Sequence, residues 1–341
     1  MSGSSSEDHL RTIRALSTAD GPLSSGAPTA SVNNPDWWRG SRPTGDRSDL
    51  HDSVLDEVRT EKPGVRSTYR AILLAGPPGA GKSTVREMVT GAGQDEFLQI
   101  DADDMKERLL RRALADKSYD SWIKPAAVRE REQAGERFHP MELSSLVHEE
   151  SAFLAERLRV ESIERGDDIV IDTVLSSDTK ARQIMGELER AGYDVQVMDV
   201  EVPREVSDER IRTRWREGNE RAEKGDGLGG RWVPSEFGAW VYGEPDGRSR
   251  PEANARMVAE ESPAVSRYRV YRKTAEQERE DPRAPATLVT DMSRASRGGP
   301  LVPTRSGPTT EAPRARPLPG ITRTGRTAPG RPGPARADRG R

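Results

Sequence analysis

Residues 76–84 have the spacing of glycine, lysine and serine that holds a polyphosphate. The stretch reads Gly-Pro-Pro-Gly-Ala-Gly-Lys-Ser-Thr, matches G-x-x-x-x-G-K-[ST] and follows the apolar run at 71–75. In this pattern backbone N–H groups surround the phosphates, the lysine reaches the β- and γ-phosphates and the serine hydroxyl binds Mg²⁺. We predict a binding loop for a nucleoside triphosphate and Mg²⁺ made of Gly76, Pro77, Pro78, Gly79, Ala80, Gly81, Lys82, Ser83 and Thr84.

A group of carboxylates follows the second expected strand, residues 97–101. This strand ends in Asp101, and Asp103 and Asp104 come directly after it. Kinases of small molecules place an acid there to accept the proton of the acceptor hydroxyl. The alternative interpretation is that acids at the start of a helix only stabilise its N-terminus. The chain has no [NT]KxD element, as switch GTPases need, and no expected strand that ends in Asp-Glu, as in motor ATPases.

Arginines gather further along the chain, where a kinase could use them to neutralise the transferred phosphoryl group. They lie in and after an expected helix at 203–218 and in the loop 224–234, and most of them are expected to form only a solvated helix face. The set comprises Arg210, Arg212, Arg214, Arg216, Arg221 and Arg231.

Strands and helices alternate between the two ends of the chain. Apolar runs predict strands at 71–76, 97–101, 168–174 and 194–203, with a possible fifth at 286–292. Helical spacing and terminal glycine or proline signals predict helices at 144–166, 178–192 and 203–218. This order predicts an α/β fold of the P-loop NTPase type, with a parallel sheet flanked by helices.

Composition divides the 341 residues into three parts. Only a third of the residues are apolar and a third are charged, which is too polar for one compact domain of this length. We expect a disordered N-terminal tail at 1–60, a kinase domain at 61–292 and a disordered Pro/Gly/Arg-rich tail at 293–341. The last tail has eleven arginines and two acids, so weak attraction to nucleic acid competes with the simpler interpretation of a solvated tail.

The chain lacks several features that would place it in other classes. It has no cysteine, a net charge of −3, no ordinary signal peptide at the N-terminus, and no run of about 18 apolar residues that could span a membrane. We expect a cytoplasmic protein without a membrane partner.

Taken together and in order, these motifs resemble those of the zeta toxins. The P-loop is followed by Ile-Asp-Ala-Asp-Asp-Met-Lys at 100–106, a long helix, Val-Ile-Asp-Thr at 170–173, Val-Glu-Val-Pro at 200–203, Arg-Thr-Arg-Trp at 212–215 and Gly-Arg-Trp-Val-Pro at 230–234. The resemblance covers about residues 65–240 and leaves both ends unmatched. It implies an ATP- and Mg²⁺-dependent P-loop kinase that phosphorylates the sugar 3′-hydroxyl of UDP-N-acetylglucosamine or a similar sugar nucleotide.

The resemblance also implies roles for single residues. Asp103 would be the general base on the sugar hydroxyl, Lys82 would hold phosphates, and Arg214 and Arg231 would stabilise the migrating phosphoryl group. Ser83 and Asp172 would support Mg²⁺. The residues Glu156, Glu149 as its alternative, and Thr173 would contact the sugar nucleotide.

Two departures from the family pattern leave the acceptor open. Thr173 directly follows Asp172 where the family often has Gly-Thr, and extra residues around 115–140 lengthen the region expected to shape the acceptor pocket. The acceptor could be another small-molecule or RNA hydroxyl. A nucleotide-gated binding protein that acts through its tails is the alternative of another class. A separate antitoxin-like inhibitor is a further partner that the resemblance implies.

Overall fold

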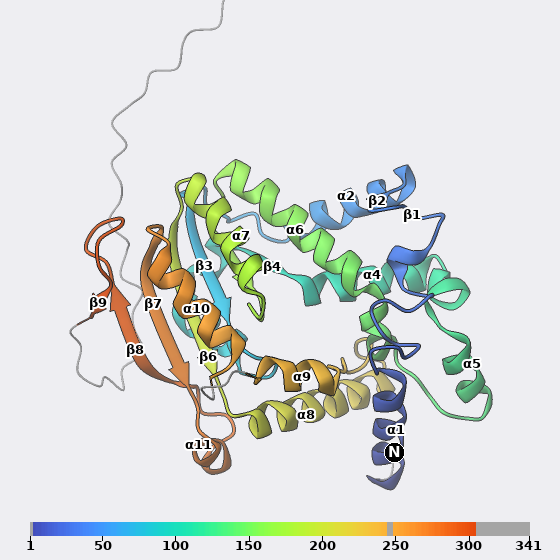
Figure 1. Ribbon diagram of the computed structural model, residues 1–341. Helices are drawn as coiled ribbons and strands as arrows, with labels where there is room; N and C mark the ends of the chain where they lie inside the picture. Colours follow the sequence, from blue (N-terminus) through green and yellow to red (C-terminus); the bar gives the residue numbers. More distant parts are fainter. Residues whose placement is uncertain (1–2, 244–247, 305–341) are drawn as a thin grey trace, which may run out of the picture.

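The computed structural model describes residues 3–243 and 248–304, and its centre is a sheet in the order β4-β5-β3-β6-β7-β8-β9 (Figure 1). The first five strands in this order are parallel, whereas β8 and β9 pair antiparallel. The strands are β3 (Arg70–Ala75), β4 (Leu98–Asp101), β5 (Ile169–Asp172), β6 (Asp194–Glu201), β7 (Val265–Arg272), β8 (Thr287–Ser293) and β9 (Val302–Pro303). The predicted α/β class with a mostly parallel sheet is confirmed.

Helices cover both faces of this sheet. The helices that follow β3 are α3 (Lys82–Thr90), α4 (Ala102–Ala115), α5 (Ala126–Gln133), α6 (His148–Arg165), α7 (Asp178–Arg190), α8 (Arg204–Glu223), α9 (Ser235–Val241), α10 (Arg250–Glu261) and α11 (Ala275–Glu280). Shorter helical turns are η2 (Gly91–Glu96), η3 (Tyr119–Ile123) and η4 (Pro140–Val147). The long helix predicted at 144–166 therefore consists of the end of η4 followed by α6.

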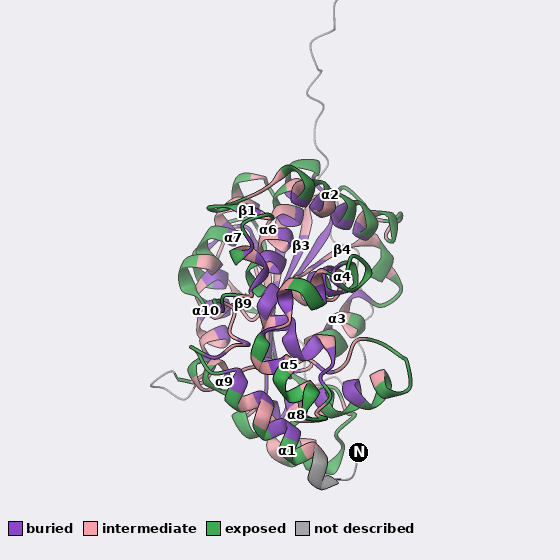
Figure 2. Ribbon diagram, turned by 90° about the vertical axis from the view of Figure 1, so that its right-hand side faces the viewer, coloured by how far each residue is buried: buried purple, intermediate pink, exposed green. Residues whose placement is uncertain are grey.

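The parallel strands form because their apolar residues can be buried on both faces. Every residue of β3 from Ala71 to Ala75 is buried, and Figure 2 shows the central strands as the most buried part of the molecule. Such continuous apolar runs are typical of parallel strands between two helical layers. Their carboxyl ends meet at one edge, which holds the P-loop and the acids Asp101 and Asp172 that end β4 and β5.

The fifth parallel strand differs from the prediction. It is β7, whose sequence Val-Ser-Arg-Tyr-Arg-Val-Tyr-Arg alternates with arginines and was not predicted as a strand. The strand expected at 286–292 exists as β8 but runs antiparallel beside β7. The arginines of β7 are tolerated because Arg267 pairs with Asp291 at 2.5 Å and Arg269 hydrogen-bonds to Gln196, contacts that depend on the neighbouring strands.

Residues 3–60 form helices in the structure, which corrects the expectation of a disordered tail. They comprise α1 (Gly3–Leu16), η1 (Ser31–Asn33), the hairpin of β1 (Trp38–Arg39) and β2 (Arg42–Pro43), and α2 (Gly45–Thr60). Leu10 and Ile13 of α1 and Val54 and Leu55 of α2 are buried in the main core. The apolar residues are too few to reveal a fold by composition, but each is buried against the domain.

A buried ion pair further anchors this N-terminal segment. Arg47 on α2 donates to Glu150 on α6 at 2.5 and 2.7 Å, and His51 Nε2 lies 2.6 Å from the same carboxylate. Burial would raise the pKa of Glu150, but the hydrogen bonds from His51 and Arg47 lower it to about 2. Because removing one partner of such a pair leaves an uncompensated buried charge, the segment is an integral part of the domain.

The lengthened region around 115–140 packs against the N-terminal segment. Tyr119, Ile123 and Val128 are buried in the core, and Trp122 Nε1 donates to the carbonyl of Ala30 at 3.3 Å. The expected boundary after residue 292 falls within β8, and β9 follows it. The remainder of the predicted C-terminal tail, residues 305–341, lies outside the described residues.

Candidate functional site

The P-loop connects the carboxyl end of β3 to the start of α3. Gly76, Gly79 and Gly81 have φ of 140°, 75° and 94°, a backbone region that favours glycine. A Cβ on Gly76 would lie 2.3 Å from the carbonyl oxygen of Val200 on β6. The loop therefore needs glycine both for its turns and for its close approach to the neighbouring strand.

Helix α8 fixes the outer side of the same loop. Ser207 Oγ donates to the Pro78 carbonyl at 2.6 Å, and Arg210 donates to the carbonyls of Gly79 and Ala80 at 3.1 and 3.2 Å. Arg210 also pairs with Glu278 on α11 at 2.6 Å. Arg210, one of the arginines singled out from the sequence, thus contacts loop carbonyls and a carboxylate.

The lysine side chain of the loop lies near the end of β5. Lys82 Nζ donates to the Gly76 carbonyl at 3.0 Å and lies 3.8 Å from Asp172 Oδ1 at the end of β5. Ser83 and Thr84 are exposed. A serine hydroxyl and a carboxylate are oxygen ligands of the kind that suits Mg²⁺, which binds few protein oxygens and takes the rest from phosphates and water.

Two acids occupy neighbouring strand ends. Asp101 on β4 and Asp172 on β5 are register partners, and Asp101 also caps α4 by accepting from the Asp103 N–H at 2.8 Å. Burial, followed by the charges of Asp172 and Asp103, raises the pKa of Asp101 to about 6. Asp101 therefore has a structural role as a helix cap within a strongly negative strand edge.

Asp103 lies at the meeting point of the predicted groups. Its carboxylate accepts hydrogen bonds from Arg231 and from Lys106 Nζ, the latter at 3.0 Å. Burial would raise the pKa of Asp103, but the charges of Arg231, Lys106 and Lys82 hold it well below its usual range. An ionised carboxylate is thus kept beside the P-loop lysine.

Arg214 lies on α8 near these groups without binding them. It is exposed, and within residues 3–243 and 248–304 it has no hydrogen bond or ion pair. Partial loss of water around its guanidinium lowers its pKa, and the charges of Arg231 and Arg210 lower it further. A guanidinium that is close to two others and without a carboxylate partner is suited to an anionic ligand.

The predicted substrate residues differ in their surroundings. Glu149, in the first turn of α6, is exposed. Glu156, two turns further, pairs with Lys180 of α7 and accepts from Gln183 at 3.3 Å. The Thr173 hydroxyl accepts from the Leu175 N–H at 3.1 Å and so holds the turn after β5.

Two residues of the site received no role from the sequence. Lys106, the lysine of the Asp-Asp-Met-Lys segment, is buried and binds Asp103. Burial and the charge of Lys106 lower the pKa of His148, and the charges of Glu149 and Asp103 act against them. A lysine one helical turn after Asp103 was a signal that could have been read, whereas the position of His148 depends on how α6 packs against α4.

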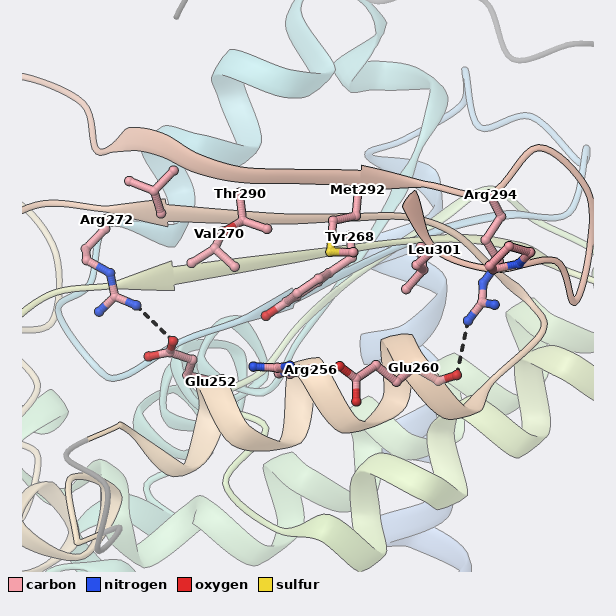
Figure 3. Close-up of a pocket in the computed structure, with 12 residues that line it drawn as sticks. Glu252, Arg256, Glu260, Tyr268, Val270, Arg272, Thr290, Met292, Arg294 and Leu301 are labelled. Carbon is pink, nitrogen blue, oxygen red and sulfur yellow. Dashed lines mark hydrogen bonds and ion pairs between the residues drawn. The ribbon is translucent and has the colours of Figure 1, made fainter. Parts of the chain in front are cut away.

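A pocket with a volume of about 460 Å³ lies elsewhere, between α10 and the strands β7 and β8 (Figure 3). Its charged groups are paired, since Arg272 binds Glu252 and Arg256 binds Glu260, each at 2.8 Å, while Arg294 donates to backbone carbonyls. It shares no residue with the P-loop site, and we do not assign the candidate function to it.

Within the described ranges, no cluster of three or more His, Cys, Asp or Glu side chains could by itself hold a metal ion. No helix there is long and apolar enough to cross a membrane.

The chain is similar to a known protein family and to solved structures. The family model described as "Zeta toxin" matches residues 55–244. A crystal structure of AvrRxo1-ORF1:-ORF2 with ATP is 18% identical, with a TM-score of 0.51 over 86% of this chain and 78% of that chain. A structure of the PezAT chromosomal toxin-antitoxin system of Streptococcus pneumoniae is 17% identical, with a TM-score of 0.47 over 74% of this chain and 83% of that chain. No curated protein sequence matches the chain.

The fold and the loop define a P-loop protein, with the loop at the carboxyl edge of a mostly parallel sheet. Since the family model matches more than half of its residues, the chain belongs to the zeta toxin family. The resemblance inferred from the motifs is confirmed.

Proposed function

We propose that this protein is an ATP- and Mg²⁺-dependent phosphotransferase that phosphorylates the sugar 3′-hydroxyl of UDP-N-acetylglucosamine or a similar sugar nucleotide. The observation that carries the proposal is the position of the Asp103 carboxylate. It binds Arg231 and Lys106, and the positive charge of Lys82 helps to lower its pKa. A base, a nucleotide loop and cationic side chains thus meet at one edge of the sheet, as phosphoryl transfer requires.

The P-loop would hold the nucleotide. Lys82 is positioned to exchange its contact with the Gly76 carbonyl for the β- and γ-phosphates. Ser83 and Asp172 would hold Mg²⁺, which supplies charge neutralisation between the phosphates when bound. The preorganised loop, fixed by Ser207 and Arg210 from α8, needs no folding step to receive the phosphates.

Asp103 would act as the base. The acceptor oxygen forms a bond to the γ-phosphorus, the bond from that phosphorus to the bridging oxygen breaks, and ADP leaves. The hydroxyl proton passes to the Asp103 carboxylate. A carboxylate with a low pKa can serve because the transition state of phosphoryl transfer is loose and the proton leaves late.

Arginines would stabilise the phosphoryl group during transfer. Arg231 already contacts Asp103 and so lies beside the position of the acceptor hydroxyl. Arg214 is exposed and close to Arg231, so its guanidinium is available to the equatorial phosphate oxygens. These two guanidinium groups would stabilise the transition state more than the ground state, because negative charge is spread over the transferred phosphoryl group in the transition state.

The acceptor would lie between α4 and the first turn of α6. Glu149 is the better candidate for a sugar-nucleotide contact, because it is exposed and directly follows His148, which lies near Asp103. The charges of both Glu149 and Asp103 act on the pKa of His148. Glu156 would first have to give up Lys180. Thr173 would contact the acceptor only by sharing a hydroxyl that already holds the turn after β5.

A separate inhibitor protein is the partner that we propose. The similar structures contain AvrRxo1-ORF1 with AvrRxo1-ORF2 and the PezAT toxin-antitoxin system. The proposal places the protein in the cytoplasm, where UDP-sugars are made. A weak contact of the arginine-rich residues 293–341 with nucleic acid is compatible with their charge and is secondary to the transfer site.

The substitution Asp103→Asn tests the proposal. It removes the base while the amide can still occupy the same space, so transfer to UDP-N-acetylglucosamine should fall by about 10²–10⁴-fold with ATP binding retained. Product formation is followed by mass spectrometry and ATP binding by calorimetry. Asp104→Asn is the matched control, since Asp104 lies in the same helical turn but binds Arg108 at 2.9 Å.

Unchanged transfer in Asp103→Asn would contradict the assigned base. Phosphorylation of a different hydroxyl in an acceptor screen, with UDP-N-acetylglucosamine left untouched, would keep the reaction and replace the acceptor. Tight ATP binding without transfer to any small molecule would favour the nucleotide-gated binding protein instead.

A further inference from the structure

A buried carboxylate outside the transfer site joins the N-terminal helix to the rest of the domain. Glu142 of η4 is 2% exposed and accepts from four donors. They are His9 Nε2 at 3.0 Å, Trp215 Nε1 at 2.8 Å, Asn219 Nδ2 at 3.0 Å and the His139 N–H at 2.8 Å. Because a carboxylate only accepts hydrogen bonds, His9 must donate through Nε2.

This cluster continues into the loop that carries Arg231. The Oδ1 atom of Asn219 accepts a hydrogen bond from the Gly230 N–H at 2.7 Å. In addition, the Met141 N–H donates to the Leu228 carbonyl at 2.9 Å. Hydrogen bonds through Asn219 therefore connect Gly230, the residue directly before Arg231, to the Glu142 carboxylate. His9 binds the same carboxylate.

Close packing leaves this loop little room to move. A Cβ on Gly230 would lie 2.0 Å from the Trp215 carbonyl oxygen, and a Cβ on Gly229 would lie 2.3 Å from His139 Cβ. The loop backbone thus rests directly on α8 and on the residue that precedes η4. Any shift of these supports is transmitted to the loop, because packed backbones cannot be compressed.

The N-terminal helix also reaches the residue after Arg231. The Arg14 guanidinium lies 5.4 Å from the centre of the Trp232 ring, and the His9 ring stacks on Trp215 at 5.8 Å. Both views of the molecule show α1 beside α8 (Figures 1 and 2). Gly230 and Trp232, the two neighbours of Arg231, are therefore both held from the side of α1.

We propose that α1 is a positioning element of the transfer site and that His9 is its positioning residue. His9 acts through Glu142 and Asn219 on Gly230, and the loop then presents the Arg231 guanidinium to Asp103. This inference rests on the proposed function, because it assigns a task to Arg231 in phosphoryl transfer. It implies that residues outside the P-loop core set the rate of the transfer step.

The chain of contacts predicts a separation of kcat from KM for ATP. The P-loop is braced by Ser207 and Arg210, near the start of α8, whereas His9 acts near Trp215 and Asn219, further along the same helix. Losing His9 should therefore disturb Arg231 and spare nucleotide binding.

The test compares His9→Leu with His9→Gln in the full chain. Leucine removes the donor, whereas glutamine can place an N–H near the position of Nε2. For His9→Leu we expect kcat to fall about ten- to a hundredfold with KM for ATP within about twofold of wild type. His9→Gln should recover most of the rate. Arg11→Ala, an exposed position on the same helix, is the control and should match wild type.

Hydrogen exchange of the backbone amides at 226–234, measured without substrates, gives a readout independent of activity. The Gly230 amide should exchange faster in His9→Leu and at the wild-type rate in His9→Gln and Arg11→Ala. If His9→Leu does not fold, Arg14→Met tests the second contact of α1 with this loop, with faster exchange at Trp232 expected.

Three results would overturn the inference: wild-type kcat in His9→Leu, a lowered kcat with unchanged exchange at Gly230, or a glutamine variant as impaired as the leucine one. Failure of the proposed function is recognised separately, because wild type would then transfer phosphate to no acceptor. Hydrogen exchange at Gly230 would still show whether His9 stabilises the Arg231 loop.

Discussion

The P-loop and the Arg231 loop are built in opposite ways. The P-loop is a contiguous stretch whose glycines, lysine and serine all lie within residues 76–84. The Arg231 loop, residues 229–232, depends on supports from α1, η4 and α8 that are remote in sequence. A site element made from one stretch can be recognised by its pattern, whereas an element held by remote segments has no local pattern to recognise.

The two loops should therefore respond differently to substitution. A change in the P-loop side chains should remove chemistry and leave the fold intact. A change in the Arg231 loop should affect both the rate and the stability, since its backbone is part of the packing between elements.

Lys82→Ala should have the largest effect on activity. Among the described residues, the polar contacts of the lysine side chain are with the Gly76 and Pro77 carbonyls and, at longer range, with the Asp172 carboxylate. We expect phosphate transfer to fall on the order of 10³-fold, with the free energy of unfolding within about 0.5 kcal/mol of wild type. Transfer assays and urea denaturation measure the two quantities.

Lys62→Ala serves as the control for this substitution. Lys62 pairs with Asp95 at 2.7 Å, away from the loop, and its loss should leave transfer unchanged. A Lys82→Ala protein that unfolds at markedly lower urea concentration would show that the P-loop is not independent of the surrounding packing.

Gly230→Ala should affect both quantities. The added Cβ would meet the Trp215 carbonyl oxygen at 2.0 Å, so the loop must shift and carry Arg231 with it. We expect kcat to fall on the order of 10²-fold and the free energy of unfolding to fall by about 1–3 kcal/mol. Steady-state kinetics and denaturation on the same preparation test this.

The same chemical change at Gly186 is the matched control. Gly186 lies within α7 with open space around it, so alanine there should stabilise the helix by about 0.5–1 kcal/mol and leave kcat unchanged. Equal behaviour of the two alanine variants would remove the distinction between the loops.

Asp101→Asn should have the smallest effect of the three substitutions. We expect it to change the free energy of unfolding by an amount that depends on pH. The pKa of Asp101 is raised to about 6 by burial and by Asp172, so the folded protein holds this proton more tightly than the unfolded chain. Ionisation therefore costs stability as pH rises from about 4 to 6, and the full cost is present above pH 6. Asparagine removes it, because its side chain can still accept from the Asp103 N–H.

We expect Asp101→Asn to gain about 1–2 kcal/mol over wild type at pH 8 and to lose this advantage near pH 4. Thermal denaturation across this range measures the difference. Asp104→Asn, at an exposed position of the same helix, should differ from wild type by no more than about 0.5 kcal/mol at either pH. A gain that grows toward low pH would have the opposite sign and contradict the raised pKa.

Local signals placed most of the sheet and the nucleotide loop. The strands β3, β4, β5 and β6 have apolar runs that need burial on both faces, and the P-loop follows one of them. The prediction failed for β7 because its arginines interrupt the apolar pattern, and their partners lie on neighbouring strands. It failed for residues 3–60 because few of their side chains are apolar.

The sequence by itself determined the P-loop, the acid after β4 and the α/β alternation, because each depends on residues close together in the chain. Only the tertiary structure decided that Arg231 binds Asp103 and that α1 supports the loop from behind. These contacts join residues more than a hundred positions apart, such as Asp103 with Arg231 and His9 with Glu142. Their partners are selected by how the helices pack on the sheet, which no local pattern encodes.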